Sequence, residues 1–425
     1  MSVFNLHEVL PAYSGGQCKS SRRTPICSTL PPELLSLIFH HYLKLSSPYD
    51  PEKGESLGQR VLAEHLLLVC RSWRDAAMGD SSLWREIILD PEIARVTPYK
   101  SLDSYIKIRS IRSRAQLLHV SINNDRDQVE RLPYLKAYCH LVGTMSRWER
   151  LFYYLKRYDA HSCISIYHLA SPTPNLREVV IRAPTPALGL DLSEALPLVD
   201  LSQTLPETPN LKLLEISVPG IDSLPPLFGK SVTIASIQIV RIEAWRNALS
   251  QLENMHTLIL QPPHTMTVWY RSAGMPLLNL PSVRTVILVG PLFAWNFRVR
   301  GLQFPALQTF EIDLSASGAE KQWSKARAGR FRLKSLLEAG LQELILKGIW
   351  FDRLEDIVEI LQDANGSVGE VVCIDVTCTL QNGEGHKVEI DLTAILMQSA
   401  VSSASPSAIL RSLRAKYMAS SGPTE

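Results

Sequence analysis

The first part of the chain shows the hydrophobic spacing of a helix. Apolar side chains recur there at i, i+1, i+4, i+5 and i+8, namely Leu34, Leu35, Ile38, Phe39 and Tyr42. This spacing places them on one face of a helix. Pro32 and Glu33 suit its first turn, because N–H groups lack an intrahelical partner there and the positive helix end favours an acidic side chain. The pattern predicts a helix that starts at Pro32.

A second apolar stripe follows further along the chain. Its members, at i, i+3 and i+7, are Leu66, Val69 and Trp73. Gly79 marks the expected end of this second helix. Asp80 or Ser81 is expected to cap a short turn that holds Leu83 and Trp84. Helices of this size cannot bury all of this apolar surface among themselves, so the surplus must be covered by a partner or by the rest of the chain.

The body of the chain repeats a six-residue phrase that is apolar at its first, fourth and sixth positions. The six copies begin at Leu176, Leu211, Met255, Val283, Leu307 and Leu341. With 45% hydrophobic residues, three such positions arise by chance at about one start in eleven. Proline stands two residues before the first position in four of the six copies, which makes the phrase more specific. Each copy predicts a strand, and Ile234–Val240 and Leu118–Ile122 are candidates for degenerate copies.

Other segments predict helices and strands around these copies. Residues 105–122 predict a helix followed by a strand, and the basic residues beside that helix are interpreted as a solvated face rather than as contacts to phosphate or to an acidic substrate; they are Lys107, Arg109, Arg112 and Arg114. Residues 132–158 predict a helix before the apolar stretch 164–169. Residues 371–380 and 387–392 predict a closing hairpin or final strands. Residues 409–417 are read either as a short basic amphipathic helix or as disordered chain.

Composition narrows the class of protein. The chain has 425 residues, more than one typical domain, with 44 Lys and Arg against 42 Asp and Glu. Its net charge of +2 gives no bulk attraction to nucleic acid or to an anionic membrane. Seven scattered cysteines are typical of a reducing compartment, so a cytoplasmic or nuclear location is expected. The apolar runs are too short for a membrane-spanning helix, and residues 1–28 lack the pattern of a secretory signal.

Candidate chemistry is weak. The sequence contains no G-x-S-x-G, G-x-x-x-x-G-K-[ST] or H-E-x-x-H motif and no C-x-x-C pair, so we expect no enzyme, no cofactor and no metal. His40 and His41 are interpreted as surface imidazoles on the first helix. Cys70 is interpreted as a buried and inert thiol. Glu355, Asp356 and Glu359 have the spacing of the solvated side of an amphipathic helix.

Four blocks near the N-terminus resemble the F-box in their order and approximate spacing. They are Leu30–Leu35, Ile38–Phe39, Val69–Arg74 and Leu83–Trp84, within residues 30–89. The F-box is the helical module through which substrate receptors dock on the Skp-type adaptor of cullin-RING ubiquitin ligases. Here residues 44–60 replace the few residues that usually join the first two helices. They are expected to form a looped-out insertion, which costs little because loop-closure entropy grows only logarithmically with length.

The repeated phrase resembles the strand of a leucine-rich repeat. Each repeat would add one strand to a parallel sheet and return on the other side. The copies start 35, 44, 28, 24 and 34 residues apart and lack the usual ladder cysteine or asparagine, so the array is expected to be irregular. A different α/β arrangement remains open.

The resemblances imply an α/β fold in which a small N-terminal helical F-box is followed by an irregular leucine-rich-repeat solenoid. The expected parts are a flexible segment (1–28), an F-box with its insertion (29–90), the repeat domain (91–400) and a serine-rich tail (401–425). They further imply a non-catalytic substrate receptor, in which the F-box helix lies in a groove of the adaptor, the adaptor connects to a cullin and the repeats hold a protein substrate.

The family pattern, carried over position by position, implies nine adaptor-binding residues: Leu30, Pro31, Pro32, Leu34, Leu35, Ile38, Phe39, Val69 and Trp73. Five polar strand positions either face the substrate or are exposed polar filler: Arg177, Lys212, Arg284, Gln308 and Gln342. The alternative function is a repeat-based scaffold that acts without a ubiquitin ligase, with the N-terminal helices only capping the solenoid. Neither nucleic acid nor membrane is expected as a partner.

Overall fold

The chain divides into two compact units. In the computed structural model, the residues described are 30–44, 62–124, 132–155, 169–183, 199–202, 204–205, 207–218, 221–238, 245–261, 277–290, 302–315, 322–323, 341–351, 368–381 and 387–391. The described residues up to Leu83 form the helical unit, and those from Trp84 onward form the sheet unit. Several expectations lie outside the described residues: the lead-in 1–28, most of the insertion 44–60, the acidic segment 355–359 and the possible helix 409–417.

The helical unit begins with α1 (Pro32–Lys44), as its proline and glutamate predict. The prediction of one continuous second helix is wrong. The structure has two helices there, α2 (Ala63–Leu66) and α3 (Arg71–Gly79), because the backbone of Cys70 is extended, with φ −161° and ψ 172°. The 3₁₀ helix η5 (Ser81–Trp84) follows, and the side chain of Asp80 accepts a hydrogen bond from the Ser82 N–H at 3.0 Å, which confirms the predicted cap.

The predicted apolar face of α1 has two parts. Leu35 and Phe39 are buried, with 1% and 0% exposed, whereas Leu34 and Ile38 are 47% and 42% exposed. The Phe39 ring packs against the Trp73 ring of α3 with centroids 4.9 Å apart and planes at 60°. The i, i+4 pair Leu35 and Phe39 therefore belongs to the interior of the unit, and the neighbours one residue earlier face outward.

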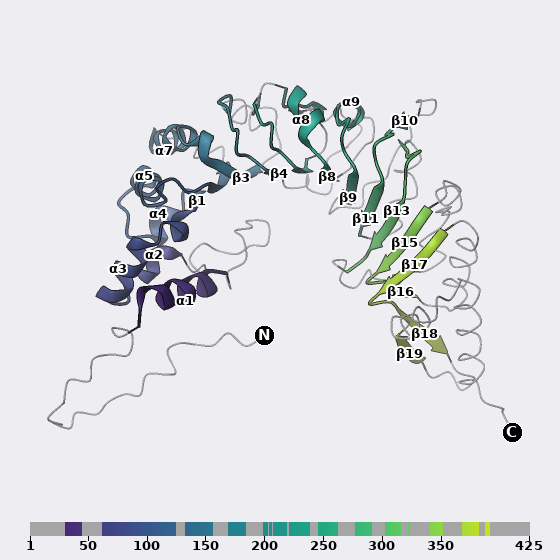
Figure 1. Ribbon diagram of the computed structural model, residues 1–425, viewed down its shortest axis with the longest axis horizontal. Coiled ribbons are helices and arrows are strands. Elements are labelled where there is room, and N and C mark those ends of the chain that lie inside the picture. The colour runs from purple at the N-terminus through teal and green to yellow at the C-terminus, as the bar shows by residue number, and fades with distance from the viewer. Residues whose placement is uncertain are drawn as a thin grey trace, which may run out of the picture. The chain divides into compact units, whose positions relative to one another are not determined.

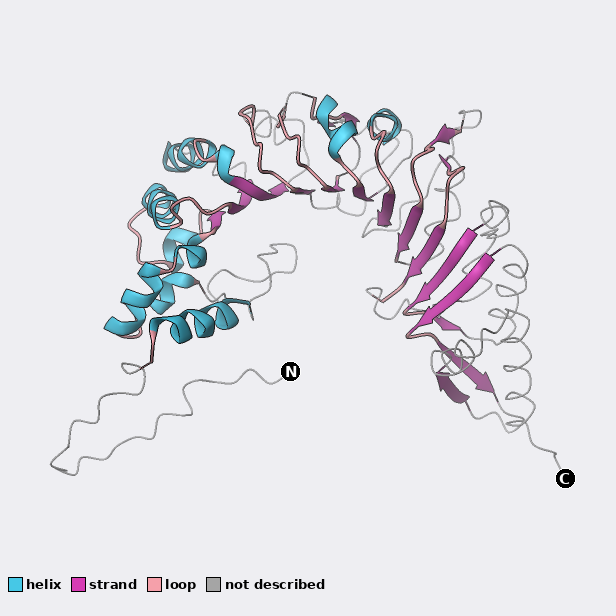
Figure 2. Cartoon of the chain, viewed as in Figure 1, coloured by secondary structure: helices cyan, strands magenta, loops and turns pink. Residues whose placement is uncertain are grey.

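The sheet unit contains a parallel sheet whose eleven described strands lie in chain order (Figures 1 and 2). The strands are β1 (Glu86–Leu89), β2 (Leu118–Asn124), β3 (Trp148–Leu155), β4 (Glu178–Arg182), β6 (Leu213–Ser217), β8 (Ile234–Gln238), β9 (Thr257–Gln261), β11 (Thr285–Val289), β13 (Thr309–Asp313), β15 (Leu341–Lys347) and β17 (Val368–Ile374). The predicted mixed α/β class with N-terminal helices is confirmed. The leucine-rich-repeat solenoid stays a prediction.

All six copies of the repeated phrase form strands of this sheet. Their first, fourth and sixth positions are buried, none more than 4% exposed. The strands pair so that equivalent positions are adjacent: Leu258 aligns with Val286, Val286 with Phe310, and Phe310 with Leu344. The same side of every copy therefore builds one continuous core. The two candidate degenerate copies are confirmed as strands β8 and β2.

Asparagines connect the turns that precede three of these strands. The side-chain amides of Asn175, Asn210 and Asn254 each donate to a backbone carbonyl of the segment before the neighbouring strand, those of Ser146 in η6, Pro174 and Lys230 in α8, at 2.7–2.9 Å. The usual ladder position lacks asparagine. The asparagine just before the first apolar residue makes a similar hydrogen bond between neighbouring repeats.

The segment 132–158 differs from its prediction as one helix. It forms α7 (Leu132–Val142), the 3₁₀ helix η6 (Met145–Arg147) and then strand β3. Apolar side chains occur on both faces of β3: Tyr153 is 1% exposed and its neighbour Tyr154 is 5% exposed. Burial on both faces removes the alternation that distinguishes a strand in sequence.

The remaining described elements lie beside the main sheet. The helices are α4 (Ile93–Val96), α5 (Leu102–Arg112), α8 (Pro226–Ser231) and α9 (Arg246–Gln251). Short strands form separate parallel pairs, β5 (Val199–Asp200) with β7 (Ile221–Ser223) and β10 (Leu278–Asn279) with β12 (Leu302–Gln303). A further sheet contains β14 (Gln322–Trp323), β16 (Trp350–Phe351), β18 (Thr377–Gln381) and β19 (Lys387–Asp391). Its antiparallel pair β18–β19 confirms a closing pair of strands. The predicted strand 371–380 is wrong as a single element, because it is divided between β17 and β18 at Asp375, whose φ is 50°.

The basic residues of α5 are not all solvated. Arg109 is only 2% exposed, and its guanidinium carbon lies 5.5 Å from the Trp84 ring centroid and 5.4 Å from that of Tyr105. It also donates to the backbone carbonyl of Glu86. Arg112 lies over the Trp84 ring at 4.5 Å. These two arginines therefore pack against the first strand region of the sheet unit, which corrects the interpretation as a purely solvated face.

Candidate docking surface

The structure places the nine implied adaptor-binding residues at different depths. Five are exposed, namely Pro31, Pro32, Leu34, Ile38 and Val69, and two are half-buried, namely Leu30 and Trp73. Leu35 and Phe39 are buried and cannot contact a partner directly in this structure. Phe39 packs against Trp73 and so holds α1 against α3, which fixes the orientation of the exposed residues beside it. Whether the exposed residues bind an adaptor stays a prediction.

Exposed apolar side chains are concentrated in the helical unit. Seven of the twelve exposed large hydrophobic residues in the described chain lie there: Leu34, Leu37, Ile38, Tyr42, Leu68, Val69 and Met78. Single exposed apolar residues are normal on a protein surface, but a concentration in one small unit marks an interaction surface. The helical unit therefore carries more apolar surface than its own helices cover.

Sequence reasoning missed three members of this set. Leu37 and Leu68 are each 67% exposed, and Met78 is 40% exposed. Leu37 stands three residues after Leu34 and one before Ile38, so helical spacing alone places it near the exposed stripe. Leu68 lies in the turn between α2 and α3, where periodicity has no predictive value.

One carboxylate connects α1 to the end of α3. Asp80 accepts hydrogen bonds from the Ser36 hydroxyl on α1 and from the backbone and hydroxyl of Ser82. His40 Nε2 lies 3.1 Å from Asp80 Oδ2 and 2.9 Å from the Ser82 hydroxyl. His40 is therefore half-buried in a polar network, which corrects its interpretation as a surface imidazole; His41 is exposed as expected.

This network lowers the pKa of Asp80. Burial acts in the opposite direction and is the largest single influence, but the hydrogen bonds from Ser36 and Ser82 and the charge of His40 together outweigh it. Asp80 is therefore ionised in the folded protein. A charged acceptor makes each of these hydrogen bonds stronger, so the group acts as a clamp between the two helices.

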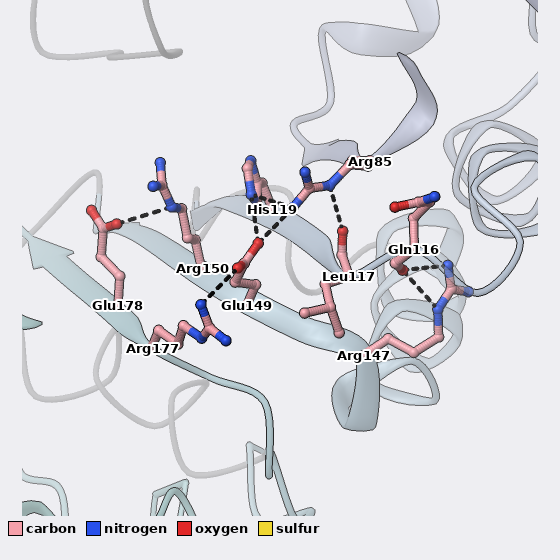
Figure 3. Close-up of polar contacts among 9 residues, drawn as sticks. All are labelled: Arg85, Gln116, Leu117, His119, Arg147, Glu149, Arg150, Arg177 and Glu178. Carbon is pink, nitrogen blue, oxygen red and sulfur yellow. Dashed lines mark hydrogen bonds and ion pairs between the residues drawn. The ribbon is translucent and has the colours of Figure 1, made fainter. Parts of the chain in front are cut away.

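A second polar network lies in the sheet unit, around Glu149 (Figure 3). The Glu149 carboxylate lies 2.5 Å from Arg85 Nη2, 3.2 Å from His119 Nε2 and 3.7 Å from Arg177 Nη1. Next to it, Arg150 Nε lies 3.1 Å from Glu178 Oε2. The network connects the beginnings of neighbouring strands.

The charges in this network change the titration of its members. The pKa of Glu149 is lowered: burial raises it, but the hydrogen bond with His119 and the charges of Arg85 and Arg177 outweigh burial. The pKa of His119 is lowered by burial and by the charge of Arg85. His119 is therefore neutral at neutral pH and acts as a hydrogen-bonding partner within a structural ion-pair network.

The described residues hold no group of three or more His, Cys, Asp or Glu that could bind a metal ion. Cys70 is half-buried at the start of α3, so its interpretation as a buried thiol is wrong. Cys373 is buried, and burial raises the pKa of its thiol to about 12, which keeps it protonated and unreactive. Among the residues that the structure describes, no helix combines the length and the apolar character needed to cross a bilayer.

Comparison with known proteins agrees with the geometry of the N-terminal part. A family model described as F-box-like matches residues 27–90, which contain the helical unit and strand β1. F-box domains generally bind Skp-type adaptors, so an F-box-like domain suggests a substrate-adaptor role in ligases of this type. Neither the curated proteins nor the solved structures contain a match to this chain.

Proposed function

We propose that this protein is a non-catalytic substrate receptor of a Skp-cullin-F-box ubiquitin ligase. The observation that carries the proposal is the coincidence of the F-box-like match with a concentration of exposed apolar side chains in the same unit. The helical unit docks on the adaptor, the adaptor connects to a cullin, and the sheet unit holds a protein substrate. Ubiquitin transfer belongs to other subunits, and the chain itself contributes binding only.

The docking helix is α1. Its exposed stripe consists of Leu34, Ile38 and Tyr42, which recur at i, i+4 and i+8 and are 36–47% exposed. An amphipathic helix that enters a hydrophobic groove uses side chains at this spacing. The interior pair Leu35 and Phe39 and the Asp80 clamp hold α1 in place, so little conformational freedom is lost on binding.

The exposed stripe provides the test. Replacing Leu34 and Ile38 by alanine removes two anchors, and each is expected to weaken adaptor binding by about 2 kcal/mol because binding energy concentrates in a few central residues. The measurement is titration calorimetry of full-length protein with a purified Skp-type adaptor. The matched control is Leu132→Ala with Leu135→Ala, two leucines of α7 that are 63% and 48% exposed.

The double variant should bind the adaptor at least a hundredfold more weakly than the control does, with unchanged circular dichroism. Equal adaptor affinities of the double variant and the control would show that Leu34 and Ile38 of α1 do not contribute to adaptor binding. Failure of the unmodified protein to bind any Skp-type adaptor would favour the alternative, a binding scaffold that acts without a ligase.

The sheet unit serves as the substrate-binding part, and we propose that it is an irregular leucine-rich-repeat solenoid. Three features support this: one strand per phrase, strands added in chain order with equivalent positions aligned, and asparagine amides that bridge successive turns. Such arrays bind ligands over an extended face rather than in a single pocket.

A further inference from the structure

Polar side chains, all exposed except the half-buried Thr233, form a continuous row just before the strands of the sheet unit. In chain order its central members are Arg177, Lys212, Thr233, His256 and Arg284. Each backbone N–H from Lys212 onward donates to the carbonyl of the preceding member, at 2.8–3.0 Å. These hydrogen bonds bring residues that are far apart in sequence next to one another on adjacent strands. We name these five residues the basic row.

The basic row carries positive charge that is compensated only at Arg177, which pairs with Glu149. Arg177 retains 65% of its side-chain exposure beside Glu149 (Figure 3), and Lys212, His256 and Arg284 are exposed. No ion pair joins Lys212 or Arg284 to a carboxylate among the described residues, and the row continues into two neutral amides, Gln308 and Gln342. A surface cation that has no carboxylate partner is available to one on another molecule.

The outward positions of β8, β9 and β11, at the centre of the row, are uncharged. On β9 and β11 the outward positions are Thr257, Ile259, Thr285 and Ile287, which are half-buried. On β6 the outward Glu215 is already paired with Arg182, whose Nη2 lies 2.7 Å from Glu215 Oε1. Beside the centre of the row, therefore, a ligand meets hydroxyl and aliphatic groups, and the outward carboxylates lie towards its ends, on β4 and β13.

On the basis of the proposed receptor function, we propose that the basic row binds an extended, acidic segment of the protein substrate. Neighbouring strands lie about 4.8 Å apart, so Lys212 and Arg284, three strands apart, are separated by about 14 Å along the row. An extended peptide advances about 3.3 Å per residue, so carboxylates about four residues apart reach both cations. The threonine and isoleucine side chains of the adjoining strands then contact the peptide backbone and its uncharged residues.

A protein segment fits this surface better than nucleic acid does. The whole chain has a net charge of only +2, and the basic row provides few phosphate contacts. The outward positions of β6, β8, β9 and β11 carry no aromatic side chain on which bases could stack.

The experiment measures binding of a fluorescein-labelled decapeptide of alternating glutamate and serine to the full-length protein by fluorescence anisotropy at low salt. The test variant is Lys212→Glu with Arg284→Glu. The control is Lys136→Glu with Lys230→Glu, which changes the net charge equally at two exposed lysines outside the row. The test variant should bind the decapeptide about tenfold more weakly than the control, because two attractive contacts become repulsive.

Equal peptide affinities for the two variants, or no binding by the unmodified protein, would overturn the proposal. Tighter binding of a thymidine oligonucleotide of equal charge would also overturn it, in favour of nucleic acid. The test is separate from that of the receptor function, because adaptor binding should be unchanged in Lys212→Glu with Arg284→Glu. If the protein binds the decapeptide but no adaptor, the site for an acidic segment is supported and the role in a ubiquitin ligase is contradicted.

Discussion

The Asp80 clamp gives a prediction whose size follows from the structure. Asp80→Asn keeps the shape of the side chain and removes its charge, so its hydrogen bonds with Ser36 and Ser82 become neutral ones. Hydrogen bonds to a charged group contribute about 1.5–3 kcal/mol and neutral ones about 0.5–1.5 kcal/mol, so the variant should destabilise the helical unit by about 1–2 kcal/mol.

The same group predicts a dependence on pH. The pKa of Asp80 is lower in the folded protein than its ordinary value of 3.8, because hydrogen bonds from Ser36 and Ser82 and the His40 charge outweigh the effect of burial. A lowered pKa contributes stability that is fully present above the unfolded value and is lost as pH falls through the folded value. The stability difference between the natural protein and Asp80→Asn should therefore shrink as the pH falls below about 4.

Hydrogen exchange of the α1 and α3 amides, read by mass spectrometry, measures the opening free energy of this unit separately from that of the sheet. The control is Asp75→Asn on the exposed side of α3, which should change the opening free energy by less than about 0.5 kcal/mol. If the α1 amides exchange equally slowly in Asp80→Asn and in Asp75→Asn, the Asp80 carboxylate does not hold the two helices together.

Two further predictions concern the sheet unit. At Gly229 on α8, an added Cβ would collide with the backbone carbonyl of Gln251 on α9. Gly229→Ala should therefore lower the free energy of unfolding, measured with urea, by about 1–3 kcal/mol. The control is Gly79→Ala, whose Cβ meets nothing within 4 Å and which should lower the free energy of unfolding far less. Equal midpoints for these two variants would contradict the close approach. Phe310→Ala should lower the free energy of unfolding by about 3–5 kcal/mol, because the Phe310 ring is 0% exposed in the continuous core. Gln308→Ala, at an exposed position, should leave the free energy of unfolding nearly unchanged in the same measurement. Similar losses of stability in Phe310→Ala and Gln308→Ala would contradict the assignment of Phe310 to the core and of Gln308 to the surface.

The strands of the body could be predicted because their signal is repetitive. One strand's apolar pattern is ambiguous, but six copies with matching positions, four of them preceded by proline, identify the inward side chains such as Leu258 and Phe310. Strand β3 lacks this help. Tyr153 and Tyr154 are both buried, so its sequence resembles an apolar helix segment.

The docking surface could be predicted only in part. The helical spacing groups Leu34 with Leu35 and Ile38 with Phe39, since neighbouring residues differ by about 100° around the helix axis. Which of each pair is buried depends on where Trp73 of α3 lies, and that information is not contained in α1. The break between α2 and α3 is invisible to periodicity for a similar reason.

By itself, the sequence determined the start of α1 at Pro32, the inward positions of the repeated strands and the F-box-like order of the N-terminal blocks, because these depend on local backbone chemistry and on spacing along one element. Only the tertiary structure decided which apolar residues of α1 stay exposed, that Arg109 lies under Trp84, and that Arg177, Lys212 and Arg284 share one row. These facts depend on packing and strand register, which place residues distant in sequence within a few ångströms of one another.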